Sequence, residues 1–239
     1  MYLFKNYIKK KIKRFQGSKN VLKMNFYYHK ILGEKNIGEI GLDFSQKENK
    51  QKIIQDTINR KKYLSYLEIG CFRDELFKNI ECKKKVGVDP LSGGTIRKTS
   101  DEFFSTNKDY FDFIFIDGLH YYSQVKKDIF NSVKFLNRNG VIMLHDCLPN
   151  SVYDQAIPRC QYYWNGDVWK AIVETRTLDY LDTYTCYADA GIGIILKRTN
   201  NSKLNLDLKD FSKLKFKDYY QNFKSFMNIV ESTELKNLF

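Results

Sequence analysis

The sequence predicts an α/β fold in which helices cover both faces of a doubly wound, mostly parallel sheet. Four apolar runs of strand length each end at a polar residue, and they span residues 63–70, 84–89, 111–117 and 140–146. A segment with helical spacing of its apolar residues, 122–138, separates the last two runs. Strands that alternate with helices in this way are typical of a parallel sheet with crossover helices.

The remaining segments complete a sheet of seven strands whose last strand is antiparallel. A helix is expected after Ser45, which we predict as its N-cap, and a second helix at 74–80. Residues 95–99 predict a short strand, and the tail after residue 200 has helical spacing. The last expected elements are a helix at 167–177 and a closing pair of strands at 181–188 and 191–198.

The 239 residues are enough for one sizeable α/β domain with additions. We predict a basic N-terminal arm with a helical addition at 1–45, a domain at 46–200, and a helical tail at 201–239 that packs on the domain.

The positive charge is concentrated at the N-terminus. Residues 1–30 carry nine Lys and Arg and no acid, whereas the formal net charge of the whole chain is +12. The rest of the chain therefore contributes only +3. An amphipathic helix at 2–15 predicts either a solvated basic helix that packs on the domain by one apolar stripe or a weak contact with a membrane surface or a polyanion. Nucleic acid is not an expected partner of the nearly balanced domain.

Five cysteines form no CxxC pair, and their odd number favours reduced thiols over a disulfide framework or a zinc site. No apolar run approaches the roughly 18 residues that span a bilayer. The N-terminal segment lacks the pattern of a secretory signal. These features predict a cytoplasmic protein.

Polar residues follow the apolar runs where the carboxyl ends of parallel strands meet, which is the usual position of a ligand in such a sheet. The four ends read Glu68-Ile69-Gly70-Cys71, Val88-Asp89-Pro90, Asp117-Gly118-Leu119-His120 and His145-Asp146. An acid at one strand end is often only a helix cap, but four such ends in succession predict a ligand site.

Asp89 lies 19 residues after Gly70, the spacing at which a βαβ unit presents an acid to ribose hydroxyls. The turn GCFRDE has one glycine and not the three that cradle a pyrophosphate. The pattern therefore favours a nucleoside ligand without phosphates.

Five motifs in this order, YLEIGC, VGVDP, TSDEFF, FDFIFIDGLHYY and GVIMLHDCLP, resemble the class I S-adenosylmethionine (SAM)-dependent methyltransferases. With the later NGDVWKAI they resemble the bacterial branch associated with surface-sugar and natural-product biosynthesis. The resemblance covers roughly residues 50–200. It implies a Rossmann-like sheet, SAM as cofactor, and methyl transfer to a hydroxyl of a small-molecule or glycan acceptor. The expected acceptor is a sugar, nucleotide-activated or linked to a capsular or other surface polysaccharide, or a similar small metabolite.

Carried onto this sequence, the resemblance implies seven cofactor-binding residues. They are Glu68, Gly70, Cys71, Asp89, Ser100, Asp101 and Asp117. Phe72 and Asp74 depart from the pattern, because they stand where the family usually has its second and third glycines.

Three candidate catalytic residues, His120, His145 and Asp146, lie beside Asp117 at the strand ends. A histidine is suited to removing the proton of an acceptor hydroxyl. Alternatively, Asp117, His145 and Asp146 form an O,N,O set for a divalent cation such as Mg²⁺, which would acidify the hydroxyl. Related sugar O-methyltransferases have Glu-Asp where this chain has His-Asp.

Two other functions remain open. The basic arm permits an RNA-modifying methyltransferase, and the departures at Phe72 and Asp74 permit a catalytically silent SAM-fold protein in surface-glycan assembly. A homo-oligomer is expected. Trp164, Trp169 and Tyr162-Tyr163 fit both stacking on a sugar and packing within a lid.

Overall fold

The computed structural model describes residues 18–239, so the expected helix at residues 2–15 lies outside the described residues. Within residues 18–239, seven strands form one sheet in the order β2-β1-β3-β4-β6-β5-β7. The strands are β1 (Ser65–Ile69), β2 (Lys84–Val88), β3 (Phe111–Ile116), β4 (Leu136–Leu144), β5 (Asp182–Cys186), β6 (Ile192–Leu196) and β7 (Ile229–Val230). The α-helices are α2 (Lys19–Leu32), α3 (Lys50–Lys61), α4 (Ser100–Thr106), α5 (Tyr122–Phe135), α6 (Trp169–Arg176), α7 (Phe216–Met227) and α8 (Leu235–Leu238). Short 3-10 turns occupy Phe77–Asn79, Phe211–Lys213 and Ser232–Glu234.

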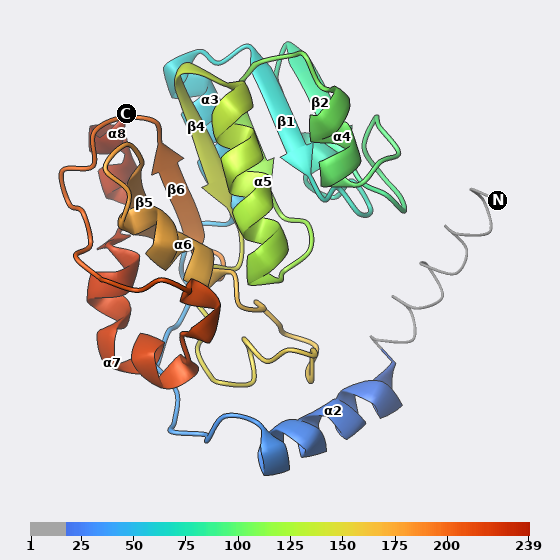
Figure 1. The fold of residues 1–239 in the computed structure, drawn as a ribbon. Helices are drawn as coiled ribbons and strands as arrows, with labels where there is room; N and C mark the ends of the chain where they lie inside the picture. The colour runs from blue at the N-terminus through green and yellow to red at the C-terminus, as the bar shows by residue number, and fades with distance from the viewer. Residues whose placement is uncertain (1–17) are drawn as a thin grey trace.

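The predicted Rossmann-like sheet is confirmed. Only β6 runs antiparallel to its neighbours β4 and β5, and the other four pairs in this part of the chain are parallel. Figure 1 shows the arrow of β6 opposite to that of β4. The antiparallel strand is thus the sixth along the chain, not the last.

The seventh strand comes from a different segment than predicted. Residues 95–99 form only one bridge, Val88 to Ile96, because the chain enters α4 directly after its N-cap Thr99. The edge strand β7 instead comes from the C-terminal tail and pairs with β5. The expected helix at 74–80 is likewise reduced to the 3-10 turn at Phe77–Asn79.

Helix α3 begins later than the sequence predicted. Its N-cap is Asn49, whose side chain accepts a hydrogen bond from the Lys52 amide at 2.9 Å, and not Ser45. Both residue types are good caps, so the local sequence did not distinguish them. This shift makes Lys50 the first residue of the helix, which matters for the site described below.

The helices bury both faces of the sheet (Figure 1). On one face Ile53, Ile54 and Ile58 of α3 pack with Phe113 and Phe115 of β3. Each isoleucine that is fully buried contributes about 1.5–3 kcal/mol. The opposite face is covered by α5, and the alternate residues of the same strands point into that second core.

The C-terminal tail packs on the sheet domain through α7. Phe216 and Tyr219 of this helix are fully buried, and the ring of Tyr219 lies 4.9 Å from that of Trp169 in α6. Within residues 18–239, no helix has both the length and the apolar character that crossing a bilayer requires. The division at residues 45 and 200 stays a prediction.

Candidate active site

The turn after β1 brings the chain very close to the end of β3. Gly70 has φ = 95°, and a Cβ at this position would lie 2.2 Å from the carbonyl oxygen of Asp117. Only glycine fits such an approach in this left-handed conformation. Gly70 therefore holds the predicted cofactor turn against the strand end that carries Asp117.

The two residues that replace family glycines nevertheless adopt a glycine-like backbone. Phe72 has φ = 47° and Asp74 has φ = 65°. The Asp74 carboxylate accepts a hydrogen bond from the Gly94 amide at 2.5 Å, and the Phe72 amide donates to Asp89 at 3.0 Å. These bonds offset part of the cost of the left-handed conformation, which is roughly 1–2 kcal/mol for a residue with a side chain.

Asp89 joins the loops after β1 and β2. Its buried carboxylate accepts hydrogen bonds from the amides of Phe72, Leu91 and Ser92 at 2.7 to 3.0 Å. A carboxylate has about four acceptor positions, so one remains for a ribose hydroxyl. The role in binding ribose stays a prediction, and the structure adds a role in positioning both loops.

Ser100 and Asp101 lie together at the first turn of α4. The amide of Gln124 bridges them, since its Nε2 lies 3.2 Å from Ser100 Oγ and 3.0 Å from Asp101 Oδ1. The same nitrogen lies 3.0 Å from Asp128, whose burial raises the pKa of its carboxyl to about 6. Gln124 was not among the predicted residues.

Glu68 and Cys71 are both buried, and the Cys71 thiol donates to the carbonyl oxygen of Glu68 at 3.7 Å. Glu68 is buried, and burial raises the pKa of its carboxyl to about 7, although the hydroxyl of Tyr66 donates to it at 2.5 Å. The Cys71 thiol points into the core, where a Cβ on Gly87 would lie 2.7 Å from its sulfur. The thiol of Cys71 is therefore directed away from the edge of the sheet. All five cysteines, which fall in the described part of the chain, are free.

The strand ends of β3 and β4 bring the predicted catalytic residues together. The Nε2 of His120 lies 3.3 Å from Asp117 Oδ1, and its Nδ1 lies 3.2 Å from Asp146 Oδ2. The Nδ1 of His145 lies 3.2 Å from the same Asp146 oxygen and 3.6 Å from Asp117. Two carboxylates and two imidazoles thus form one cluster, which we call the strand-end cluster.

Two further charged residues, which the sequence did not indicate, complete the strand-end cluster. Lys50, at the start of α3, places its Nζ 2.6 Å from Asp117 Oδ2 and 3.4 Å from His145 Nδ1. Asp189, in the loop before β6, lies 3.2 Å from His145 Nε2 and accepts the Lys50 amide at 2.5 Å. Lys50 follows no strand, whereas Asp189 follows β5, which the sequence predicted only as part of the closing strand pair.

The charges of the cluster set the protonation of its members. Burial alone would raise the pKa of the Asp117 carboxyl, but His145, His120 and Lys50 hold that pKa well below its ordinary range. Burial disfavours the charged form of His145, yet the carboxylates of Asp146 and Asp117 raise its pKa well above the usual value. The pKa of His120 is raised as well, because Asp117 and Asp146 outweigh its burial. His145 is therefore an imidazolium held between carboxylates.

The loop that precedes α6 covers His120. The indole of Trp164 stacks on its imidazole with ring centroids 5.4 Å apart. A Cβ on Gly166 would lie 1.9 Å from the carbonyl oxygen of His120, so this loop contacts the backbone directly. Asn165 donates to Asp146 at 3.2 Å. Trp164 packs within the site, whereas Trp169 is buried in the core and Tyr162 and Tyr163 are exposed.

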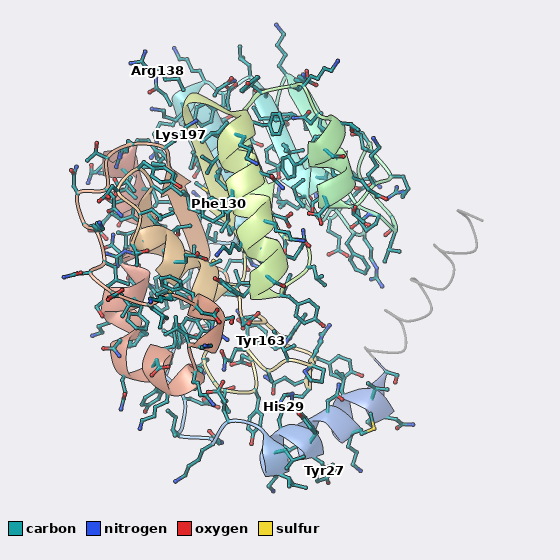
Figure 2. The ribbon with its side chains drawn as sticks, viewed as in Figure 1. Tyr27, His29, Phe130, Arg138, Tyr163 and Lys197 are labelled. Atoms are coloured by element: carbon teal, nitrogen blue, oxygen red, sulfur yellow. The ribbon has the colours of Figure 1, made fainter. Side chains whose placement is uncertain are left out.

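A pocket of about 530 Å³ lies beside the strand-end cluster and shares Asp189 with it. Hydrogen-bonding side chains dominate its lining, together with the ring of Tyr163, which Figure 2 labels in the loop between the sheet and α2. The polar lining residues are Glu39, Lys47, Glu48, Asn49, Asn150, Ser151, Asp154, Gln161 and Asp189.

Comparison with known proteins matches residues 74–147 to a family described as a methyltransferase domain. These residues include β2, β3, β4 and the predicted residues from Asp89 to Asp146, and they lie in a Rossmann-like sheet. Over these residues the chain is similar to a methyltransferase domain. No curated protein sequence matches the chain.

Solved structures with a similar chain path share little sequence with this chain. An O-methyltransferase from Bacillus cereus, in complex with S-adenosylhomocysteine (SAH), has 12% identity and a TM-score of 0.46 over 82% of this chain and 100% of its own. An SAH-bound methyltransferase from Podospora anserina has 13% identity and a TM-score of 0.47 over 76% and 97%. MycE, from the mycinamycin biosynthetic pathway and in complex with Mg, SAH and mycinamycin VI, has 14% identity and a TM-score of 0.44 over 66% and 50%.

Three residues of the strand-end cluster could hold a divalent cation. Asp117, His120 and Asp146 offer ligand atoms that all lie within 4.8 Å of one another. The Nδ1 of His120 is buried and, although it lies 3.2 Å from Asp146 Oδ2, it makes no hydrogen bond with the described residues. The set differs from the predicted one, in which His145 stood in place of His120. In the structure the two ring nitrogens of His145 face Asp146 and Asp189.

Proposed function

We propose that this protein transfers the methyl group of SAM to a hydroxyl oxygen of a sugar or of a similar small, hydroxylated metabolite. The order of groups along the sheet edge carries the proposal. The predicted cofactor residues follow β2 and β1, the strand-end cluster follows β3 and β4, and the pocket lies next to β6. The cluster therefore stands between the cofactor side and the pocket.

The lining of the pocket supports a hydroxylated acceptor. Carboxylates and amides accept and donate hydrogen bonds in the pattern that sugar hydroxyls require. The ring of Tyr163, half-exposed at the pocket, offers an apolar surface for a sugar face. Leu42, Phe44, Tyr153 and Ala190 add apolar surface to the pocket, so it offers both hydrogen bonds and apolar contacts to an acceptor.

Methyl transfer from a sulfonium requires an aligned acceptor and, for a hydroxyl, removal of its proton. Alignment is the larger effect, since it accounts for roughly 7–11 kcal/mol of the barrier in well-oriented systems. His120 is our candidate for the base, because its imidazole lies between Asp117 and Asp146, which orient the ring. A base contributes about 10²–10⁴-fold.

The same residues offer a second route. A divalent cation held by Asp117, His120 and Asp146 would lower the pKa of a bound hydroxyl and remove the need for a free base. In either route Asp146 orients the groups around it, and His145 supplies a fixed positive charge next to Asp117.

The test begins with calorimetry of SAM and SAH binding to the full chain. We then expect mass spectrometry of a screen of nucleotide-sugars and surface glycans to show a gain of one methyl group. Asp146→Asn should lose turnover while SAM still binds. If neither SAM nor SAH binds, the proposed enzyme function is wrong and a catalytically silent scaffold is favoured. If RNA alone is methylated, the RNA-modifying alternative is favoured.

A further inference from the structure

Helix α2 attaches to the rest of the protein by one side only. The side-chain amide of Asn25 donates to the carbonyl of Arg159 at 2.8 Å, and the His29 imidazole bonds the carbonyl of Pro158 at 2.7 Å. The ring of Phe26 packs at 4.9 Å from that of Tyr153. Figure 1 shows this helix below the sheet, separated from it by the loop that it contacts.

The opposite side of α2 is apolar and is not covered by any of the described residues. Met24, Tyr27 and Ile31 follow the i, i+3, i+7 spacing of this helix face, and the exposed Tyr28 and Leu32 lie between it and the attached side. Ile31 is 77% exposed and Met24 is 62% exposed. Figure 2 shows Tyr27 and His29 on opposite sides of the helix. We call these five residues the α2 outer face.

Single exposed apolar residues are ordinary on a protein surface, but a continuous stripe of them marks an interaction surface. The five residues of the α2 outer face lie between Met24 and Leu32 and include three long apolar side chains without rings. Water is a poor environment for so many adjacent apolar groups, which indicates a partner that takes them up.

The charge of this region selects the kind of partner. Helix α2 contains Lys19, Lys23 and Lys30 and no acid, and the whole of residues 1–30 carries nine basic residues without an acid. A second copy of α2 would place like charges against each other. RNA would attract the lysines but gives no site for exposed Ile31, Leu32 and Met24. An anionic lipid surface accommodates both features, because apolar side chains enter the interface while lysines contact the headgroups.

We propose that the α2 outer face binds the surface of an anionic lipid bilayer. The helix lies in the plane of the interface, with Met24, Tyr27 and Ile31 entering the boundary between headgroups and acyl chains. The lysines of α2 add the electrostatic part of the affinity, which falls with ionic strength. This surface is separate from the strand-end cluster, so the proposal stands independently of the methyl acceptor.

The test is sedimentation of the full chain with vesicles of phosphatidylcholine, with and without phosphatidylglycerol, at low and high salt. We expect binding only to the vesicles that contain phosphatidylglycerol, and we expect salt to weaken it. Ile31→Asp and Tyr27→Asp should each reduce the partition coefficient by roughly tenfold or more, because an apolar contact is lost and a repelled charge is gained.

Tyr180→Asp is the matched control. Tyr180 is 51% exposed, as Tyr27 is, but it lies in the turn before β5, far along the chain from α2. This variant should bind vesicles as the wild type does, and circular dichroism should show that all variants are folded. The proposal is overturned if anionic vesicles do not sediment the wild type, or if Tyr180→Asp weakens binding as much as Tyr27→Asp does. It is also overturned if light scattering shows a dimer that Ile31→Asp dissociates while vesicle binding is unchanged. Equal binding of RNA by the wild type and by Ile31→Asp, without vesicle binding, would assign the region to nucleic acid.

Discussion

The Nζ of Lys50 lies 2.6 Å from Oδ2 of Asp117, which joins the first residue of α3 to the end of β3. Both groups are largely buried, and the carboxylates of Asp117, Asp146 and Asp189 raise the pKa of the Lys50 ammonium against the effect of its burial. This ion pair holds the Asp117 carboxylate in place. Asp117 lies between the predicted cofactor turn at Gly70 and the two histidines of the strand-end cluster.

Replacing Lys50 tests this relationship. Lys50→Met leaves Asp117 without its closest cationic partner, and the loss of one partner of a buried pair is costly. We expect turnover to fall at least roughly tenfold, which corresponds to a loss of about 1.4 kcal/mol of transition-state stabilisation. Lys52→Met is the control, since Lys52 lies on the same helix and forms exposed pairs with Glu48 and Asp56. Equal turnover of the two variants would show that the Lys50 pair is structural only.

The two histidines of the strand-end cluster can be tested against the third histidine of the chain. His120→Gln and His145→Gln should each reduce turnover by roughly 10²–10⁴-fold if they act on the acceptor proton or its charge. Calorimetry should show that SAM binding is retained. His29→Gln is the control, because His29 lies in α2 and bonds only the carbonyl of Pro158. Wild-type rates in both cluster variants would mean that the acceptor is activated elsewhere.

Chelation separates the two routes for activating the acceptor. If Asp117, His120 and Asp146 hold a cation, EDTA should abolish turnover and added Mg²⁺ or Mn²⁺ should restore it. Calorimetry with Mn²⁺ should then detect binding to the wild type and not to Asp146→Asn. Asp101→Asn serves as a control for this measurement, since Asp101 lies at α4, outside the cluster. If EDTA does not affect turnover, no cation is needed, and His120 is the group that removes the proton of the acceptor hydroxyl.

Gly70 and Gly41 offer a matched pair for the cofactor turn. Both have positive φ, 95° and 85°, but a Cβ on Gly41 meets no atom within 4 Å, whereas one on Gly70 meets the Asp117 carbonyl at 2.2 Å. Gly41→Ala should cost only the backbone strain, roughly 1–2 kcal/mol. Gly70→Ala should cost more in urea unfolding and should abolish SAM binding in calorimetry. Similar costs for both variants would show that the turn relaxes without loss.

Glu68 gives a prediction with a defined pH window. Its carboxyl has a pKa of about 7 in the folded protein, against an ordinary value of 4.5. The folded state therefore retains a proton that the unfolded chain releases, so stability falls as pH rises between these two values. Above this pH window the free energy of unfolding is therefore lower by roughly 3 kcal/mol than below it.

Glu68→Gln mimics the protonated side chain and should remove this pH dependence. Urea unfolding should show that the variant gains stability over the wild type at about pH 8 and not at about pH 4. Glu75→Gln is the control, because Glu75 is exposed. A constant difference for Glu68→Gln would mean that the pKa of Glu68 is the same in the folded and unfolded states.

Much of the fold followed from the sequence, because apolar runs of strand length and segments of helical period are local features. The strands around Phe113 and Val141 were placed by such runs, and the residues at their carboxyl ends were correctly grouped at one edge. Where the prediction failed, contacts with an adjacent segment determined the secondary structure. Residues 95–99 have the composition of a strand, but the start of α4 directly after its N-cap Thr99 leaves them with one bridge only. The tail strand β7 exists because β5 offers it an open edge.

The sequence by itself determined the alternation of strands and helices and the tight turn at Gly70. It also determined that Asp117, His120, His145 and Asp146 follow one another at the strand ends. Only the tertiary structure brought Lys50 and Asp189 to the same cluster, since they approach it from α3 and from the loop before β6. It also directed the Cys71 thiol into the core and left the α2 outer face uncovered. The physical reason is range: hydrogen bonding and periodicity act between near neighbours in the chain, whereas charge pairing and burial depend on which distant segments meet.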